Sequence, residues 1–470
     1  MNSQSLKHTE IKFWPQLILG LAFSIASFLT PNNYDSVLPI MLFGTIFIYF
    51  LSPTLSFIYA LIFVIDPMAT FKLSAISIIP IFLCFTFFVF NTQRCLLILR
   101  KDKYLRKLMV LCLMFTFYQL IVSLLLRSQQ DFYYVFKNVR YWLGIWILIP
   151  SYIFIIIDRK NFFVSITIIV LLIMIFYYLS FYGVYNFFEI REFQRSQDNV
   201  SLIRFFSFDL RQITKIFVYI LPLFIIFPFK NRFVKFLVPL IGIMVYISVL
   251  LAILRTEMFY LFMGALLAVF ISVRQFKTIG KIKIILYGFI CVALVLFLFP
   301  TLLDTIVQTV QMSLNPGGGL SSDASTDHRL NVQLPVLMKI IESNPFFGGG
   351  NYSVSFEATG HYLLYDIPIL GAFGAYGIIG MLIYYSRFIH IFLRYKAVKM
   401  SQKLFDQFPV ECLLTNGLLA YFITMITFRT LHINIELAFD FGMAEFGLFI
   451  GVYFGLIKIL TEQRLEFKAK

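Results

Sequence analysis

The stretch FFVSITIIVLLIMIFYYLSFY, residues 162–182, contains no charged residue. An α-helix needs about twenty predominantly apolar residues to cross the hydrocarbon core of a bilayer. In hydrocarbon every backbone N–H and C=O must find its partner within the segment, so such a run predicts a helix. Similar runs recur along the 470 residues, of which 60% are hydrophobic and 13% charged, and the mean hydropathy is +0.85. The sequence therefore predicts an all-α polytopic membrane protein and excludes a soluble one.

Fourteen apolar spans are expected in a single integral membrane domain over residues 1–470. Pro31, Pro53 and Pro67 break the first three spans, so a count of twelve or thirteen also fits. The expected spans are 14–29, 37–51, 54–66, 75–91, 108–126, 139–157, 162–182, 213–229, 233–253, 257–273, 282–300, 363–386, 411–428 and 437–458.

The distribution of charge predicts which side of the membrane each loop faces. Cytoplasmic loops collect Lys and Arg. If the N-terminus is cytoplasmic, the loops on that side hold about two thirds of the 39 Lys and Arg residues but a minority of the 24 acidic ones. Five of these cytoplasmic basic residues lie from Arg387 to Lys403. Both termini are therefore expected in the cytoplasm.

The net charge of +15 is attributed to the excess of Lys and Arg in the predicted cytoplasmic loops. Nucleic-acid binding would need a basic patch on a soluble module, and no such module is predicted. The basic run from Arg94 to Lys107 is interpreted as an anchor on anionic membrane lipid. The five cysteines lie in or near spans or on the cytoplasmic side, which implies neither a disulfide framework nor a Cys-rich metal site.

Thiol labelling in intact cells tests this orientation. Cysteines introduced by Ser321→Cys and Asn351→Cys should react with a membrane-impermeant reagent, because both positions are expected outside. Lys399→Cys should stay unlabelled until the cells are permeabilised. Labelling of Lys399→Cys in intact cells would reverse the predicted orientation.

Two outer loops interrupt the apolar pattern, at 183–212 and 301–362. A loop as long as the second is uncommon in a compact protein and is usually functional or disordered. Apolar residues recur at helical spacing over 331–342, which predicts an amphipathic helix at the membrane interface with Arg329 at its start. The following element PFFGGGNY, residues 345–352, contains glycines that permit positive φ and close approach of backbone to a ligand.

Arg255 lies in the short turn ILRTE between two spans, on the expected outer side. A charge at the membrane boundary is costly unless it is paired or used. One interpretation is that Arg255 extends to the lipid headgroups or pairs with Glu257. The other is that it belongs to a site shared with the large outer loop.

Three elements together resemble the bacterial O-antigen polymerase and O-antigen ligase superfamily. They are Arg255 in its turn, Arg329 followed by LPVLMKIIESNPFFGGGNYS, and His361 in GHYLLYDIPILGAFGAYGIIGMLIYY. The match covers about residues 250 to 385. Leu254 and Tyr362 stand where the family commonly has Ser and Asn.

The resemblance implies a fold like that of the GT-C glycosyltransferases and an enzyme that needs neither metal nor other cofactor. Its donor would be a glycan on undecaprenyl pyrophosphate, handled at the outer face of a bacterial inner membrane. A chain-length regulator is a further candidate partner. The family's active residues correspond to Arg255, Arg329 and His361.

Physical chemistry gives each candidate residue a role. Arginine binds phosphate oxygens bidentately, so Arg255 and Arg329 are expected to hold the pyrophosphate, with Arg204 and Arg211 as weaker candidates. His361 is the candidate base or a further donor to phosphate, with Glu357 and Asp366 as rivals. Gly348 and Gly350 are expected to bring backbone close to the substrate.

Polymerisation of lipid-linked repeat units is the first functional prediction, and ligation to a lipid A core is the first alternative. A lipid-linked oligosaccharide flippase or other transporter is an alternative of another class, for which intramembrane charges around a central cavity are expected. A non-catalytic scaffold is the remaining alternative. The few charges expected within the spans favour chemistry at the outer surface.

Overall fold

The computed structural model describes fourteen stretches of the chain and three single residues. The described positions are 17–18, 21–22, 25, 44, 46–62, 85–125, 144–181, 184, 191–195, 202–206, 212–227, 231–251, 255–273, 334–348, 368–398, 400–429 and 442–469.

Helices dominate the described residues, as predicted. The first half of the chain contributes α4 (Pro53–Ile62), α6 (Thr92–Lys101), α7 (Lys103–Leu125), the 3-10 turn η2 (Gly144–Ile147), α9 (Leu148–Ile157), α10 (Arg159–Phe181), α11 (Gln212–Ile226) and α12 (Arg232–Leu251). The second half contributes α13 (Arg255–Ser272), α17 (Leu334–Ser343), α20 (Pro368–Val398), α21 (Gln402–Gln407), α22 (Pro409–Thr424), the π-helical η6 (Met425–Arg429) and α25 (Gly442–Ala469).

Five helices among the described residues are long and apolar enough to cross a membrane. They lie at Lys103–Val122, Arg159–Leu179, Tyr376–Lys396, Pro409–Thr427 and Phe446–Leu465. Four shorter apolar helices lie at Ile145–Ile157, Thr214–Ile225, Val234–Val249 and Tyr260–Ser272. The multi-span helical class is thus confirmed, whereas the count of twelve to fourteen includes spans such as 282–300 that lie outside the described residues.

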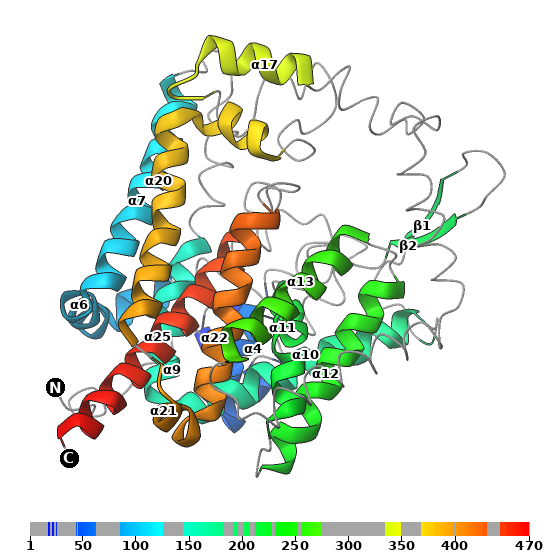
Figure 1. Cartoon of the computed structure of the whole chain (residues 1–470), viewed down its shortest axis with the longest axis vertical. Coiled ribbons are helices and arrows are strands. Elements are labelled where there is room, and N and C mark those ends of the chain that lie inside the picture. Colours follow the sequence, from blue (N-terminus) through cyan, green and yellow to red (C-terminus); the bar gives the residue numbers. More distant parts are fainter. Residues whose placement is uncertain are drawn as a thin grey trace.

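A two-stranded antiparallel sheet is an addition that the sequence did not predict. Strands β1 (Arg191–Arg195) and β2 (Leu202–Phe206) pair with Phe193 opposite Arg204, inside the predicted outer loop 183–212. Figure 1 shows this hairpin projecting from the side of the bundle. The strands are short and rich in charge, so their alternation is too weak to predict a sheet.

Close glycine contacts explain how α25 packs along η2 and α9. Gly447, Gly451 and Gly455 recur every fourth residue, so they lie on one face of α25. A Cβ at these positions would run into backbone or side-chain atoms of the residues from Ile145 to Ile155. Small residues at such intervals let two membrane helices approach closely. This stripe holds the last helix against the centre of the bundle.

Helices α7 and α20 pack side by side and form one edge of the molecule, and α17 lies across their upper end (Figure 1). Six of the buried residues of α7 follow a heptad spacing, at Leu105, Leu108, Cys112, Phe115, Gln119 and Val122, and Met109 is buried beside them. This spacing keeps one seam of a long helix against its neighbour. The α7–α20 pair therefore supports α17 and the PFFGGG element that follows it.

Candidate functional site

Three of the predicted site residues belong to elements that the structure describes. Arg255 is the first residue of α13, Arg204 lies on β2, and Gly348 closes a turn after α17 with φ of 72°. The other predicted residues, Arg211, Arg329, Gly350, Glu357, Asp366 and His361, lie outside the described residues. The described site is therefore the turn after α17 and the helix on which it docks.

The turn forms directly where α17 ends. α17 runs to Ser343, close to the predicted end of the amphipathic helix, and its last carbonyls need partners beyond the helix. The backbone N–H of Asn344 donates to Ile340 O over 3.1 Å, and that of Gly348 donates to Asn344 O over 2.8 Å. The positive φ of Gly348 is a conformation that side chains with a Cβ disfavour. The predicted role of glycine as a turn former is confirmed at this position.

Helix α20 contains a break at Gly377, where φ is 60° and ψ is −175°. A break of this kind creates a new helix start whose first N–H groups lack partners inside the helix. Two of them are satisfied by the turn after α17. Ile378 N donates to Pro345 O over 3.0 Å, and Ile379 N donates to Phe346 O over 3.2 Å. The turn therefore caps a membrane helix from outside that helix.

Tyr118 of α7 contacts both the turn and α20 beside this break. Its hydroxyl lies 2.7 Å from Tyr376 O and 2.9 Å from Phe347 O, and its ring packs against Gly380, where an added Cβ would lie 2.6 Å from the ring. The single phenolic proton can serve either carbonyl. Tyr118 thus contacts the turn and both sides of the break in α20. Nothing in the local sequence distinguishes it from the other tyrosines, so sequence analysis missed it.

Glycines are required at this junction by close contacts. A Cβ on Gly377 would overlap the carbonyl group of Phe346, a Cβ on Gly374 would meet Leu337 of α17, and a Cβ on Gly380 would meet the ring of Tyr118. The PFFGGG element and the Gly377–Gly380 motif were recognised separately in the sequence. The structure brings the two together. We call this contact the turn–helix junction, formed by residues 345–348, Tyr118 and residues 376–380.

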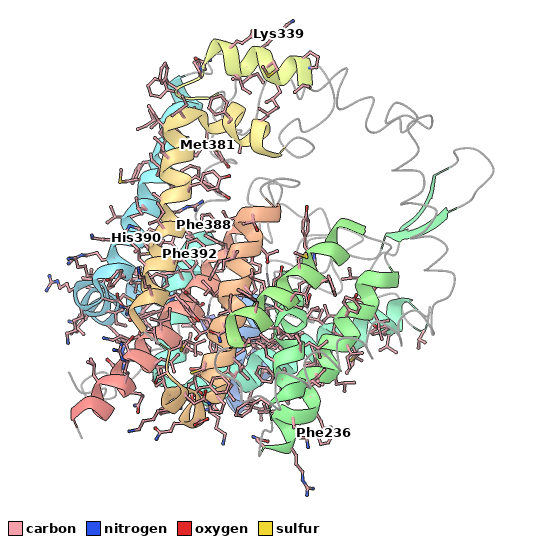
Figure 2. All side chains as sticks on the ribbon, viewed as in Figure 1. Phe236, Lys339, Met381, Phe388, His390 and Phe392 are labelled. Atoms are coloured by element: carbon pink, nitrogen blue, oxygen red, sulfur yellow. The ribbon has the colours of Figure 1, made fainter. Side chains whose placement is uncertain are left out.

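Arg255 begins a helix whose start lies toward the same end of the bundle. At the far end of α13, Ser272 accepts a hydrogen bond from Asn416 Nδ2 over 2.9 Å, and Asn416 Oδ1 accepts one from Tyr395 near the end of α20 over 2.9 Å. α13 and α20 therefore end close together. From there α13 runs toward the side of the molecule on which α17 lies, but it begins well below α17 (Figure 1). The side chain of Lys339 on α17 points away from the bundle at this end (Figure 2).

Arg387 corrects the predicted layout. It was assigned to a cytoplasmic loop after a span ending at residue 386, but α20 continues to Val398 and Arg387 lies within its membrane-long stretch. The side chain is fully buried. Its guanidinium carbon lies 4.3 Å from the ring centre of Tyr384, 5.2 Å from that of Phe115 and 5.6 Å from that of Phe446. Cation–π contacts of this kind stabilise a charge away from water.

Within the residues that the structure describes, no group of three His, Cys, Asp or Glu side chains could hold a metal ion. No protein-family model and no curated protein matches the chain. The functional assignment therefore depends on the motif residues and on the turn–helix junction that joins two of the motifs.

Proposed function

We propose that the protein polymerises lipid-linked glycan repeat units at the outer face of a bacterial inner membrane, with both termini in the cytoplasm. The single observation that supports this most is the turn–helix junction. It unites two of the three sequence elements of the O-antigen polymerase and ligase resemblance. The GT-C-like architecture implied by that resemblance is part of the proposal.

The proposed reaction joins two glycans. A hydroxyl oxygen of the acceptor attacks the anomeric carbon of the donor sugar, and the bond from that carbon to the pyrophosphate oxygen breaks. Undecaprenyl pyrophosphate leaves with its electron pair, and His361 takes the proton of the attacking hydroxyl. Arg255 and Arg329 stabilise the charge that develops on the leaving oxygen, with Arg204 and Arg211 as further phosphate ligands. Glu357 is the alternative base.

A flippase remains the second candidate because of Arg387. A charge inside the membrane is the feature expected of a transport pathway. Such a charge should line a water-filled cavity, however, and Arg387 is enclosed by aromatic rings with no exposed surface. Its environment favours a fixed position between α7, α20 and α25. Ligation to a lipid A core uses the same donor and the same residues, so the acceptor distinguishes it from polymerisation.

The proposal is tested with purified protein in detergent, verified lipid-linked repeat units and no nucleotide sugar or divalent metal. Wild-type protein should convert the repeat units to longer chains, followed by gel or mass spectrometry. Arg255→Ala, Arg329→Ala and His361→Ala should each lower the rate by about a hundredfold or more. Lysine at either arginine position should restore little, because it cannot reproduce bidentate contacts.

The control is Lys339→Ala, which removes an exposed cation from α17 and should leave the rate near that of wild type. Growth that persists in all three variants would rule out the proposed roles. No growth with wild-type protein, together with translocation of repeat units in sealed vesicles, would favour the flippase. Transfer to a lipid A core but not to a second repeat unit would favour the ligase.

A further inference from the structure

A segment of the outer loop begins directly at the turn–helix junction. The segment between Gly348 and Pro368 carries Glu357 and His361, the two candidate bases. On one side it follows the turn directly, and on the other it enters α20 a little before the break at Gly377. The junction therefore fixes the point from which this segment departs.

Tyr118 is the part of the junction supplied by a different helix. The two backbone bonds from Ile378 and Ile379 join the turn to α20, but they do not attach either of them to the rest of the bundle. The Tyr118 hydroxyl lies within hydrogen-bond distance of Phe347 O on the turn and of Tyr376 O on α20. Because α7 packs along α20 below the junction, Tyr118 ties the turn to a rigid support.

We propose that Tyr118 is a positioning residue for the reaction, which acts by holding the turn–helix junction closed, since the chain leads on from this junction to His361. This role rests on the proposed function, and Tyr118 itself touches no reacting atom. Small displacements of a catalytic group are costly, since misplacement by about 1 Å can lower a rate about a hundredfold. A side chain that fixes the turn directly before the proposed catalytic residues should therefore affect turnover more than binding.

Tyr118→Phe removes only the hydroxyl and keeps the ring that packs against Gly380. We expect the amides of Gly348, Ile378 and Ile379 to exchange hydrogen about tenfold faster, which corresponds to the loss of about one hydrogen bond. The kcat of chain growth should fall about tenfold to a hundredfold, while the KM for the lipid-linked donor changes less than threefold. Peptide-resolved hydrogen exchange by mass spectrometry and the purified polymerisation assay measure the two effects.

Tyr178→Phe is the matched control. The Tyr178 hydroxyl of α10 donates to Met244 O of α12 over 2.8 Å, so it is also a tyrosine that bonds to a backbone carbonyl of another membrane helix. Its loss should leave exchange at Gly348 and kcat unchanged. A loss of activity that is equal in Tyr118→Phe and Tyr178→Phe would show a general structural effect and overturn the proposal.

Two further outcomes distinguish the parts of the inference. Unchanged exchange at the junction in Tyr118→Phe would overturn the role of Tyr118 in closing it. Faster exchange with wild-type kcat would overturn the positioning role but leave the polymerase assignment intact. If wild-type protein makes no polymer from verified substrate, the proposed function fails and the positioning role fails with it, while the exchange result still decides whether Tyr118 closes the junction.

Discussion

Gly377→Ala is expected to open the turn–helix junction and to lower chain growth more than a hundredfold, although the protein should still insert and accumulate. The φ of 60° and ψ of −175° at Gly377 belong to a region that is essentially restricted to glycine, and a Cβ there costs about 1–3 kcal/mol. The added carbon would also overlap the carbonyl group of Phe346. Those are backbone atoms, so relief requires the turn to move away from α20.

Two arrangements are open to the variant. α20 can keep its break, which leaves the N–H groups of Ile378 and Ile379 without the carbonyls of Pro345 and Phe346. Alternatively, residue 377 adopts helical φ and ψ, the break closes, and the turn loses its docking position. Either change undocks the turn from which the chain leads on to His361, and this accounts for the expected loss of rate.

Gly44→Ala provides the control for Gly377→Ala. Gly44 is also helical, but a Cβ there would meet the Tyr59 ring only at ordinary van der Waals distance, and its φ is not positive. This variant should retain full activity and an unchanged exchange rate at the junction. Polymerisation by Gly377→Ala at the wild-type rate would show that the docked turn is not needed for the reaction.

The helices were predictable where apolar runs end at clear polar boundaries, as in α10 and α22. The C-terminal end of α20 was not, because a span predicted from sequence ends at the first charged residue. Arg387 is accommodated inside the helix among three rings, of which Phe115 and Phe446 come from distant parts of the chain. Local sequence contains no signal for such an environment.

The candidate site was also predictable only where local sequence determines the structure. The turn residues and the glycine motif were recognised because glycine and proline restrict or free the backbone locally. Their contact with each other was not predicted, and neither was Tyr118, whose hydroxyl bonds lie 229 and 258 residues away along the chain. Contacts at such separation depend on the packing of whole helices. Sequence patterns alone therefore identified the parts of the junction but not the junction.

Asp102→Ala is expected to cause the largest loss of stability, about 3–5 kcal/mol. Asp102 lies between α6 and α7 and is 5% exposed, within the run interpreted from sequence as a basic lipid anchor. One carboxylate oxygen caps α7 by accepting from the N–H groups of Tyr104 and Leu105, each over 3.1 Å. The other accepts from Tyr152 over 2.9 Å and from Arg394 over 3.2 Å.

The size of the effect follows from what Asp102→Ala leaves behind. Loss of the cap costs about 1 kcal/mol. The larger part arises because Arg394, whose side chain is 10% exposed, loses its carboxylate partner, and removal of one member of a buried pair costs about 3–5 kcal/mol. Thermal unfolding in detergent should show a clearly lower midpoint. Asp102→Asn removes the charge but keeps the side-chain oxygen that caps α7, so its loss of stability relative to wild type isolates the charge, and the further loss in Asp102→Ala isolates the cap.

Glu462→Gln is the control for this prediction, because it breaks the Lys458–Glu462 pair, in which both side chains are one third exposed. Such a pair contributes less than about 0.5 kcal/mol. Equal midpoints for Asp102→Ala and Glu462→Gln would contradict the stabilising role of the buried Asp102–Arg394 pair.

The Asp102–Arg394 pair also lies at the end of α7 and α20 opposite to Tyr118, so the two helices are joined at both ends. Weakening the Asp102–Arg394 end should therefore also speed exchange at the turn–helix junction, and less so than Tyr118→Phe, which acts on the junction directly.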